Sequence, residues 1–425
     1  MTENPQPVCL ESHRDRCMLP YFNPSKSMNN HPGHSRLPLP DPAASAHSQR
    51  LMDQIRDEID AAGGHIPFVR FMELALYAPY FGYYRSGTRK FGAGGDFVTA
   101  PELSPLFSRC LARQCQEILG VSDGAILELG AGTGVMAADV LQELETLGIL
   151  LPSCINYYIL ELSGELRERQ HATLQERVPH LLPRIRWLDN LPASGFRGII
   201  LANEVMDAMP VQRFCITEQG IAQMAVSWEA DTFIWRETQA TTHLMNAVKT
   251  LQDNLGFRLP PGYISEFNPH LDDWIKSLSK CLEAGAILLI DYGYPRREYY
   301  HPQRTDGTLL CHYRHRVHAD PLLLPGLQDI TASVDFSAVA DAARAAELTV
   351  AGYTSQTYFL FGCGLAELLA QVDPGAGAEY LELTRQVKLL TLPSEMGERF
   401  KAMALTRGLE APLRGFTVFD ERERL

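Results

Sequence analysis

The sequence predicts an α/β fold built on a mostly parallel sheet that helices cover on both faces. Five short, almost wholly apolar segments alternate with segments of helical periodicity, and the first of them runs into a glycine-rich turn. Strands that are buried on both faces appear as continuous apolar runs, because neither face meets water. This alternation favours a Rossmann-like arrangement.

The five predicted strands cover residues 125–129, 157–162, 185–188, 198–202 and 286–291. Apolar residues at helical spacing predict the intervening helices over 135–147, 165–176, 271–282 and 337–346. Two later segments, 348–353 and 358–361, are expected to be strands that complete the sheet. The rest of the chain, assigned to a C-terminal helical region over 363–425, is expected to be helical to about residue 405.

Other features divide the chain around this sheet. Residues 1–46 are rich in Pro, Ser, Asn and His and are expected to form a disordered leader. Residues 47–120 are expected to form a helical cap and a glycine-rich loop, with Pro67 in the first turn of a helix. The sheet domain is expected to comprise 121–213 and 263–362, the second part with loops around an acceptor cleft. A β-hairpin insertion is expected over 214–262, with turns at 218–220 and 229–231.

Composition excludes several classes of protein. The formal net charge of −13 disfavours nucleic acid as a partner, because phosphates would be repelled. The nine cysteines are odd in number and include no Cys-x-x-Cys, so we expect neither disulfides nor a metal site. No apolar run reaches the roughly 20 residues that span a bilayer, so no membrane insertion is expected. We therefore expect a bacterial cytoplasmic protein, with the mitochondrial matrix as the alternative.

The glycine turn predicts the cofactor. Residues 126–134 read ILELGAGTG, a strand followed by Gly130, Gly132 and Gly134, with Ala131 between the first two. A dinucleotide site has the motif Gly-x-Gly-x-x-Gly, which binds the pyrophosphate, whereas the spacing in this sequence is Gly-x-Gly-x-Gly. S-adenosylmethionine has no phosphate and needs no anion cradle. Together with Glu128 just before the turn, the motif resembles that of class I methyltransferases.

Acidic residues also stand at or just after the carboxyl ends of the second, third and fourth predicted strands. Glu161 ends the second predicted strand, where a carboxylate can accept hydrogen bonds from both ribose hydroxyls. Asp189 follows the third, where class I methyltransferases commonly hold the adenine amine. The fourth strand ends at Asn203, Glu204 and Asp207, which by the same resemblance face the transferable methyl; Asn203 is assigned to both the cofactor and the acceptor.

Further segments resemble the MidA-like family of methyltransferases, which includes a mitochondrial complex I assembly methyltransferase. They are residues 91–102 (FGAGGDFVTAPE), 127–134 (LELGAGTG), 202–210 (ANEVMDAMP), 290–293 (IDYG), 328–336 (QDITASVDF) and 392–401 (LPSEMGERFK). Position 100 carries Ala where the family usually has Ser. The resemblance implies a helical segment over the cofactor. It also implies that Gly95, Thr99, Pro101 and Glu102 help to build the pocket.

The mitochondrial relative is associated with arginine methylation of a complex I subunit, so the resemblance implies a protein acceptor. A guanidinium is effectively always protonated, and its nitrogen needs an accessible lone pair to attack a methyl group. Carboxylates can hold the guanidinium through paired hydrogen bonds and take up the released proton. Glu204 and Asp207 are the candidates, with Asp291 as a third.

Alternatives stay open at this point. The acceptor could be an oxygen or nitrogen of a small molecule, or the protein could bind the cofactor as an assembly factor without chemistry. A homodimer is compatible with the sequence. His312, His315 and His318 recur at three-residue steps, but no further ligand completes a metal set. Asp329, Thr331 and Asp335 are candidates for shaping the cleft, whereas the aromatic run 77–84 is more simply explained by packing.

Overall fold

The computed structural model describes residues 37–86, 98–148, 156–373, 375 and 377–425. Chain contacts separate Met1–Gly33 from His34–Leu425, and the second unit holds all the elements below. Most of the predicted leader lies outside the described residues, and so does Gly95. Residues 42–46, predicted to belong to the leader, are helical instead, because Asp41 accepts a hydrogen bond from the Ala44 amide and Pro42 occupies the first turn of α1.

The main sheet of the described unit is mixed, and its core is parallel. In spatial order its strands are β15 (Thr349–Ser355), β16 (Phe400–Arg407), β10 (Leu282–Tyr294), β5 (Phe196–Asn203), β2 (Ala125–Leu129), β3 (Tyr157–Leu160) and β4 (Ile185–Leu188). The five from β10 to β4 run parallel, while β16 is antiparallel to both of its neighbours. All five predicted parallel strands are therefore present.

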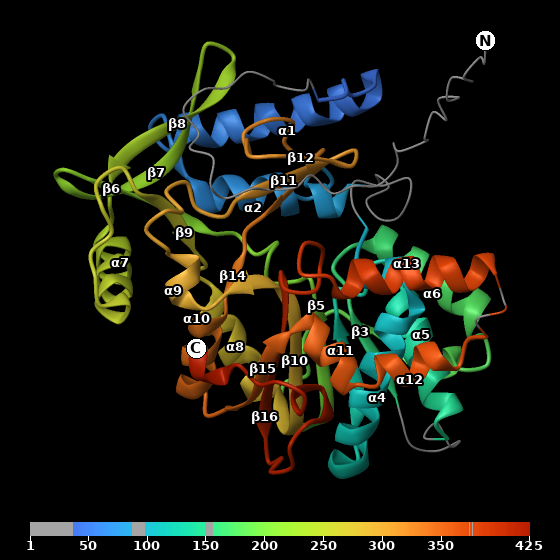
Figure 1. Ribbon diagram of the computed structural model, residues 1–425. Coiled ribbons are helices and arrows are strands. Elements are labelled where there is room, and N and C mark those ends of the chain that lie inside the picture. Colours follow the sequence, from blue (N-terminus) through green and yellow to red (C-terminus); the bar gives the residue numbers. More distant parts are fainter. Residues whose placement is uncertain (1–36, 87–97, 149–155, 374, 376) are drawn as a thin grey trace, which may run out of the picture. The chain divides into compact units, whose positions relative to one another are not determined.

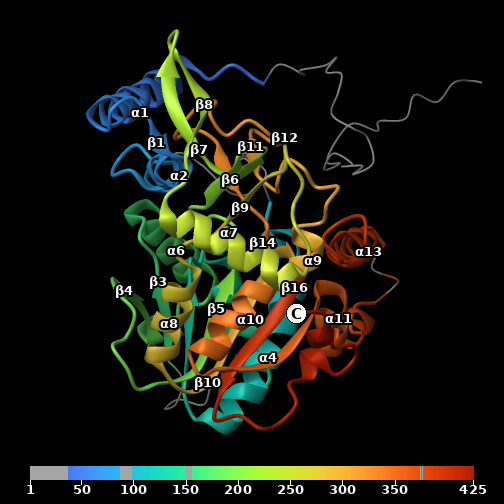
Figure 2. The same cartoon turned by 90° about the vertical axis from the view of Figure 1, so that its left-hand side faces the viewer.

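Helices cover both faces of this sheet, as the apolar strands predicted. One face carries α4 (Pro105–Ser122), α5 (Val135–Thr146), α6 (Gly164–Arg177), α11 (Gln356–Gly362), α12 (Leu365–Ala370) and α13 (Ala378–Thr391). The other carries α8 (Leu271–Cys281) and α10 (Phe336–Ala345), which lie side by side in Figure 2. Alternate strand residues enter opposite cores, as Ile126 and Leu127 do.

Two predictions for the C-terminal part are wrong. Residues 358–361, predicted as a strand, lie in the helix α11, where Phe359, Leu360 and Cys363 bury one face at helical spacing. Residues 400–405, predicted to be helical, form most of the strand β16. This segment contains the strong helix formers Ala402, Met403 and Leu405, but pairing with β10 and β15 outweighs that local preference.

The predicted hairpin insertion is a larger subdomain. It contains β6 (Gln212–Thr217), β7 (Gly220–Glu229), β8 (Thr232–Gln239), α7 (Thr242–Leu255) and β9 (Ile264–Phe267). The predicted turn at 229–231 is present, with positive φ angles at Ala230 and Asp231 that suit a tight hairpin. A fifth strand, β1 (Ile66–Pro67), comes from the N-terminal cap and pairs with β7.

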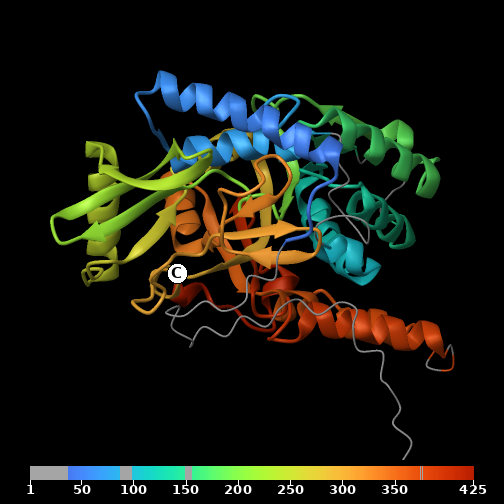
Figure 3. The same cartoon turned by 90° about the horizontal axis from the view of Figure 1, so that it is seen from above.

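The cap lies over the same end of the molecule as the insertion (Figures 1 and 3). Its helices are α1 (Pro42–Ala61) and α2 (Phe68–Tyr77), followed by the short 3-10 helix η1 (Tyr83–Arg85). Pro67, predicted in the first turn of a helix, stands one position earlier and caps α2. Apolar residues of both helices share one core with β7, β11 and β13, so cap and insertion form one packed layer.

The tract 292–335, predicted to be rich in loops, contains short elements. They are α9 (Arg296–Tyr299), β11 (Leu310–Tyr313), β12 (Arg316–His318), β13 (Asp329–Thr331) and β14 (Val334–Asp335). β14 extends the main sheet beside the end of β10. No helix in the described part of the chain is long and apolar enough to cross a membrane.

Candidate active site

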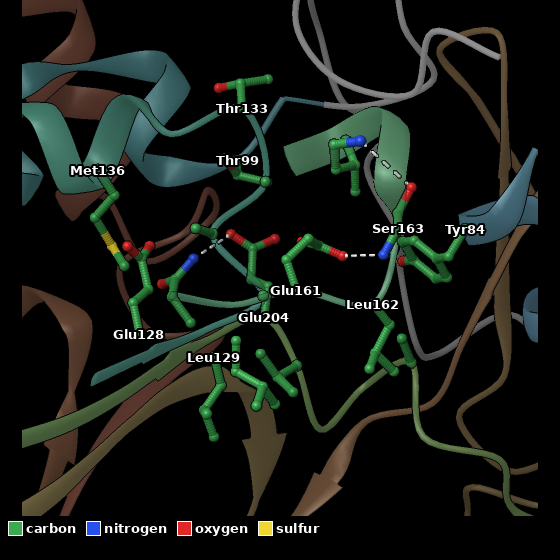
Figure 4. Close-up of a pocket in the computed structure, with 18 of the residues that line it drawn as sticks. Tyr84, Thr99, Glu128, Leu129, Thr133, Met136, Glu161, Leu162, Ser163 and Glu204 are labelled. Atoms are coloured by element: carbon green, nitrogen blue, oxygen red, sulfur yellow. Dashed lines mark hydrogen bonds between the residues drawn. The ribbon is translucent and has the colours of Figure 1, made fainter. Parts of the chain in front are cut away.

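A cavity of about 280 Å³ lies at the carboxyl ends of β2, β3 and β5 (Figure 4). In open α/β sheets ligands bind at this edge, because the loops that follow parallel strands meet there. The cavity walls come from the glycine turn, from the loops after β3 and β5, and from the segments that contain η1 and α3 (Ala100–Leu103). Five stretches from separate parts of the sequence therefore enclose one space.

The glycine turn forms the floor of the cavity. Gly130, Ala131 and Gly132 line it, whereas Gly134 lies behind them as the N-terminal cap of α5. Gly134 has φ +84°, and a Cβ there would lie 3.0 Å from the Cα of Gln170. A side chain at this position would therefore be both strained and crowded. Gly134 thus shapes the turn without facing the cavity.

Glu128, at the end of β2, brings a buried carboxylate to the cavity beside Met136 (Figure 4). Its Oε2 accepts a 2.7 Å hydrogen bond from the Tyr157 hydroxyl, while Oε1 is buried with no hydrogen-bond partner among the described residues. Burial raises the pKa of Glu128 to about 7, against the opposing effect of Tyr157. This oxygen is therefore available to a hydrogen-bond donor from outside the protein.

Glu161 follows β3 and is held on both of its oxygens. Oε1 accepts from the Ser163 amide at 2.9 Å, and Oε2 accepts from the Gln170 amide nitrogen at 3.1 Å. Burial raises its pKa, while these bonds lower it. Asp189 is not brought to the cavity: its side chain is 82% exposed and pairs with Arg167 at 2.8 Å. A contact between Asp189 and adenine stays a prediction.

The loop after β5 carries the three predicted acceptor residues, and all three line the cavity. Glu204 has φ +52°, a rare backbone conformation for a residue with a side chain. The backbone amide of Glu204 donates to the Ile290 carbonyl at 2.9 Å, and its Oε1 accepts from the side-chain amide nitrogen of Asn203 at 3.2 Å. Burial, and then the neighbouring Asp207, raises the pKa of Glu204 to about 8. A carboxyl group that titrates near neutral pH is suited to proton transfer.

Asp207 lies next to Glu204 in this loop, whereas Asp291 lies behind it. Burial raises the pKa of Asp207 to about 6, against the opposing effect of a hydrogen bond from the Tyr292 side chain. Asp291, the third predicted carboxylate, is fully buried and does not line the cavity. It accepts from the amides of Met206 at 3.0 Å, Asp207 at 3.2 Å and Tyr292 at 2.9 Å. Asp291 therefore holds the loop in place.

The aromatic run of the cap brings Tyr77 and Tyr84 to the cavity near Asp207. The Tyr77 hydroxyl donates to the Ala208 carbonyl at 2.9 Å, and the Tyr84 hydroxyl donates to Asp329 at 3.0 Å. Their rings stack with centroids 5.6 Å apart, and both rings and Asp329 line the cavity. Packing alone, the simpler sequence interpretation, therefore does not describe these two tyrosines. Thr331 and Asp335 lie outside the lining, and Asp335 caps α10.

The segment before α4 supplies the remaining predicted residues. Thr99, Pro101 and Glu102 line the cavity, and Glu102 accepts a hydrogen bond from Thr133 of the glycine turn. Sequence reasoning did not find Thr133, Arg85 or Trp274, which also line it. Arg85 donates to the Leu162 carbonyl and joins the cap to the loop after β3. Thr133 could have been found, because it belongs to the glycine motif itself.

The histidine tract lies away from this cavity. His312 belongs to β11 and His318 to β12, with His315 in the turn between them, so the three do not share a helical face. Burial lowers the pKa of His312 to about 4. In the described part of the chain, no group of three or more His, Cys, Asp and Glu side chains is arranged to hold a metal ion.

Comparisons with known proteins agree on one family. Residues 110–354 match a family model described as "putative S-adenosyl-L-methionine-dependent methyltransferase". The mitochondrial protein arginine methyltransferase NDUFAF7 of Rattus norvegicus is 29% identical over 413 residues, which cover 86% of each chain. Its Danio rerio counterpart is also 29% identical, over 84% of this chain and 87% of that protein. A Burkholderia thailandensis crystal structure with bound S-adenosyl-homocysteine is 42% identical, with a TM-score of 0.87, over 92% of this chain and 100% of that chain.

Proposed function

This chain belongs to the family of S-adenosyl-L-methionine-dependent methyltransferases, and on that premise we propose that it methylates arginine side chains of a partner protein. The family, the enzyme class and the cofactor predicted from the motifs are thereby confirmed. The arginine acceptor is the new element. It is supported by relatives that are named protein arginine methyltransferases. It is also supported by the chemistry of the acceptor end, the part of the cavity that Asn203, Glu204 and Asp207 line.

The residues around the glycine turn fit S-adenosylmethionine. Glu161 offers a positioned carboxylate for the ribose, and the unpartnered Oε1 of Glu128 offers an acceptor for a donor group of the cofactor. The turn from Gly130 to Gly132 lets a ligand approach the backbone closely. Thr99, Pro101 and Glu102 would complete the wall over this part of the cavity. When bound, the cofactor supplies a methyl group on a sulfonium centre.

One observation carries the choice of acceptor: the acceptor end is lined by hydrogen-bond acceptors. The side chains of Asn203, Glu204 and Asp207 all line it. Asn203 Oδ1 has no hydrogen-bond partner among the described residues, whereas Asp207 receives a hydrogen bond from Tyr292. A guanidinium has five N–H donors and no acceptor, so it complements such a surface. A neutral hydroxyl acceptor would leave most of these oxygens unsatisfied.

The carboxyl groups have distinct chemical tasks in this proposal. The Asn203 side chain and the ionised carboxylate of Asp207 would hold the guanidinium by hydrogen bonds and so orient one nitrogen toward the cofactor. As that nitrogen gains a methyl group, it must lose a proton. Glu204, with its raised pKa, would take this proton as the general base. The stacked Tyr77 and Tyr84 would keep water from the acceptor end, because their rings line it.

The deciding experiment follows a labelled methyl group. Purified protein and S-adenosylmethionine with an isotopic methyl label are added to a lysate that lacks this protein, and the product is hydrolysed in acid for amino acid analysis. We expect label in methylated arginine, and about 10²-fold less or lower with Glu204→Gln over the same reaction time. Label in small molecules alone would overturn the proposal in favour of a metabolite acceptor. Label in lysine or in another amino acid would overturn the arginine assignment.

The rate should depend on pH through Glu204. Because a raised pKa means that the carboxyl group is ionised only above about 8, kcat/KM should rise with pH and level off near that value. Below it the value should fall about tenfold per pH unit, in proportion to the ionised fraction. The kcat profile should bend at lower pH, since a bound cation favours the carboxylate. A flat kcat/KM profile between about pH 6 and pH 9 would contradict a general-base role for Glu204.

Within this proposal the acceptor protein is a subunit of respiratory complex I, as the family resemblance implies. The bacterial origin of a similar solved structure supports a bacterial cytoplasmic location, and the mitochondrial relatives supply the alternative of the mitochondrial matrix. The chain should then co-purify with unassembled complex I subunits. Recovery of those subunits without any trace of this protein would contradict this part of the proposal.

A further inference from the structure

Gln170 of α6 is a fully buried side chain that connects three parts of the cofactor site. Its amide nitrogen donates to the Gly132 carbonyl at 3.0 Å and to Glu161 Oε2 at 3.1 Å. Its amide oxygen accepts from the indole nitrogen of Trp187 at 2.9 Å. Gln170 does not line the cavity, so it lies behind the residues that do. Of its three side-chain partners, Gly132 and Glu161 line the cavity, whereas Trp187 does not.

The orientation of this amide is determined by its partners. An indole N–H can only donate, so the amide oxygen must face Trp187 of β4. The Gly132 carbonyl and the Glu161 carboxylate can only accept, so the amide nitrogen must face them. A flipped amide would place like groups against each other at all three contacts. The hydrogen bond from Trp187 therefore helps to fix the orientation of the Gln170 side-chain amide.

The same contact determines how Glu161 meets its ligand. One oxygen of Glu161 accepts from the Ser163 amide and the other from Gln170, and the Leu162 amide is a further backbone donor to this carboxylate. A carboxylate has about four acceptor sites on its two oxygens, so its orientation determines whether both oxygens can face two vicinal hydroxyl groups. Without Gln170, one oxygen would lose its tether and the carboxylate could rotate. The second hydrogen of the same amide fixes the Gly132 carbonyl, so the carboxylate and the glycine turn keep a constant spacing.

We propose that Gln170 is a positioning residue that couples the glycine turn to Glu161 and so gives the site its selectivity for a ribose with both hydroxyl groups. The inference rests on the proposed role of Glu161 in the cofactor site. A purely structural role would make Gln170 a satisfied core residue whose loss lowers stability and weakens every ligand equally. The two roles differ in whether the loss of affinity depends on the ribose hydroxyls.

The experiment compares two ligands in titration calorimetry: S-adenosyl-homocysteine and its 2′,3′-dideoxy analogue. Gln170→Met keeps the side-chain length but removes the hydrogen bonds. We expect it to weaken binding of S-adenosyl-homocysteine about tenfold and binding of the dideoxy analogue far less. It should also raise the pH below which S-adenosyl-homocysteine binding is lost, because Gln170 lowers the pKa of Glu161. Gln114→Met is the matched control, since Gln114 is also fully buried but lies outside the cavity lining.

Two further variants separate the outcomes. Trp187→Phe removes the N–H that orients the amide, together with part of the ring volume, and should reproduce the hydroxyl-dependent loss in a weaker form even if Gln170→Met does not fold. Glu161→Gln tests the premise. If Glu161→Gln shows the hydroxyl-dependent loss and the Gln170 and Trp187 variants do not, Gln170 has no positioning role. If none of the variants distinguishes the two ligands, the ribose role of Glu161 and the inference both fail. Neither result bears on the arginine acceptor, because no acceptor is present.

Discussion

Replacing Glu204 by Gln is expected to lower kcat by about 10²- to 10⁴-fold, the usual contribution of a positioned general base. The amide has the same shape, and its oxygen can still accept from Asn203, but it cannot take a proton. It also presents an NH₂ group to a cationic acceptor, so KM for the acceptor should rise. The affinity for S-adenosyl-homocysteine should change by no more than about twofold, because Glu161 and Glu128 are unchanged.

Steady-state kinetics and calorimetry together test this expectation. The matched control is Glu145→Gln, an exposed position of α5 that contacts His180 and does not line the cavity. This control should retain the wild-type rate. A Glu204→Gln enzyme with kcat within about threefold of wild type would exclude proton transfer through Glu204 as a major contribution to the rate. Loss of cofactor binding in this variant would instead place Glu204 on the cofactor side.

Replacing Asp291 by Ala is expected to destabilise the protein and to abolish turnover together. Asp291 is fully buried and satisfies the backbone amides of Met206, Asp207 and Tyr292. Each buried amide left without a partner costs about 1–3 kcal/mol, so the free energy of unfolding should fall by about 3 kcal/mol or more. That is a large share of the roughly 5–15 kcal/mol available to a folded protein. Because the same amides shape the loop that carries Glu204 and Asp207, kcat should fall as well.

Urea denaturation and rate measurements at a temperature where the variant is folded separate the two effects. Asp291→Asn should be intermediate, because its single side-chain oxygen can satisfy only part of this set of amides. Asp335→Ala is the control for loss of a largely buried carboxylate outside the cavity, since its side chain is 11% exposed and the change removes the cap of α10 and a contact with Arg296. It should lower stability while the folded fraction keeps its activity. An Asp291→Ala protein of wild-type stability would contradict the assigned role.

The parallel part of the fold could be read from the sequence because its strands are buried on both faces. Such strands form apolar runs, and β2 runs into glycines that only a tight turn explains. β16 could not be found in this way. Its apolar run is also a good helix sequence, and only its pairing partners, which lie over 40 residues away in the chain, decide between helix and strand.

Some residues of the candidate site could be predicted from their position after a strand, and others could not. Glu161, Glu204 and Asp207 were predictable because they follow strands whose carboxyl ends meet at one edge. Asp189 follows a strand too, but its side chain turns outward to Arg167, and strand position does not determine side-chain direction beyond the strand end. Tyr157, Gln170 and Tyr84 act through hydrogen bonds to distant elements, and such bonds leave no periodic signal in the sequence.

The position of β16 also determines when the protein can fold during its synthesis. β16 pairs with β10 on one side and β15 on the other, yet it is made after every other described strand. Until the ribosome has released residues 400–407, β10 and β15 each expose an edge with unpaired backbone groups. Such edges are templates for association between chains. Ribosomes that stall before residue 400 should therefore produce nascent chains that aggregate and recruit chaperones, even though the cofactor half of the sheet is already complete.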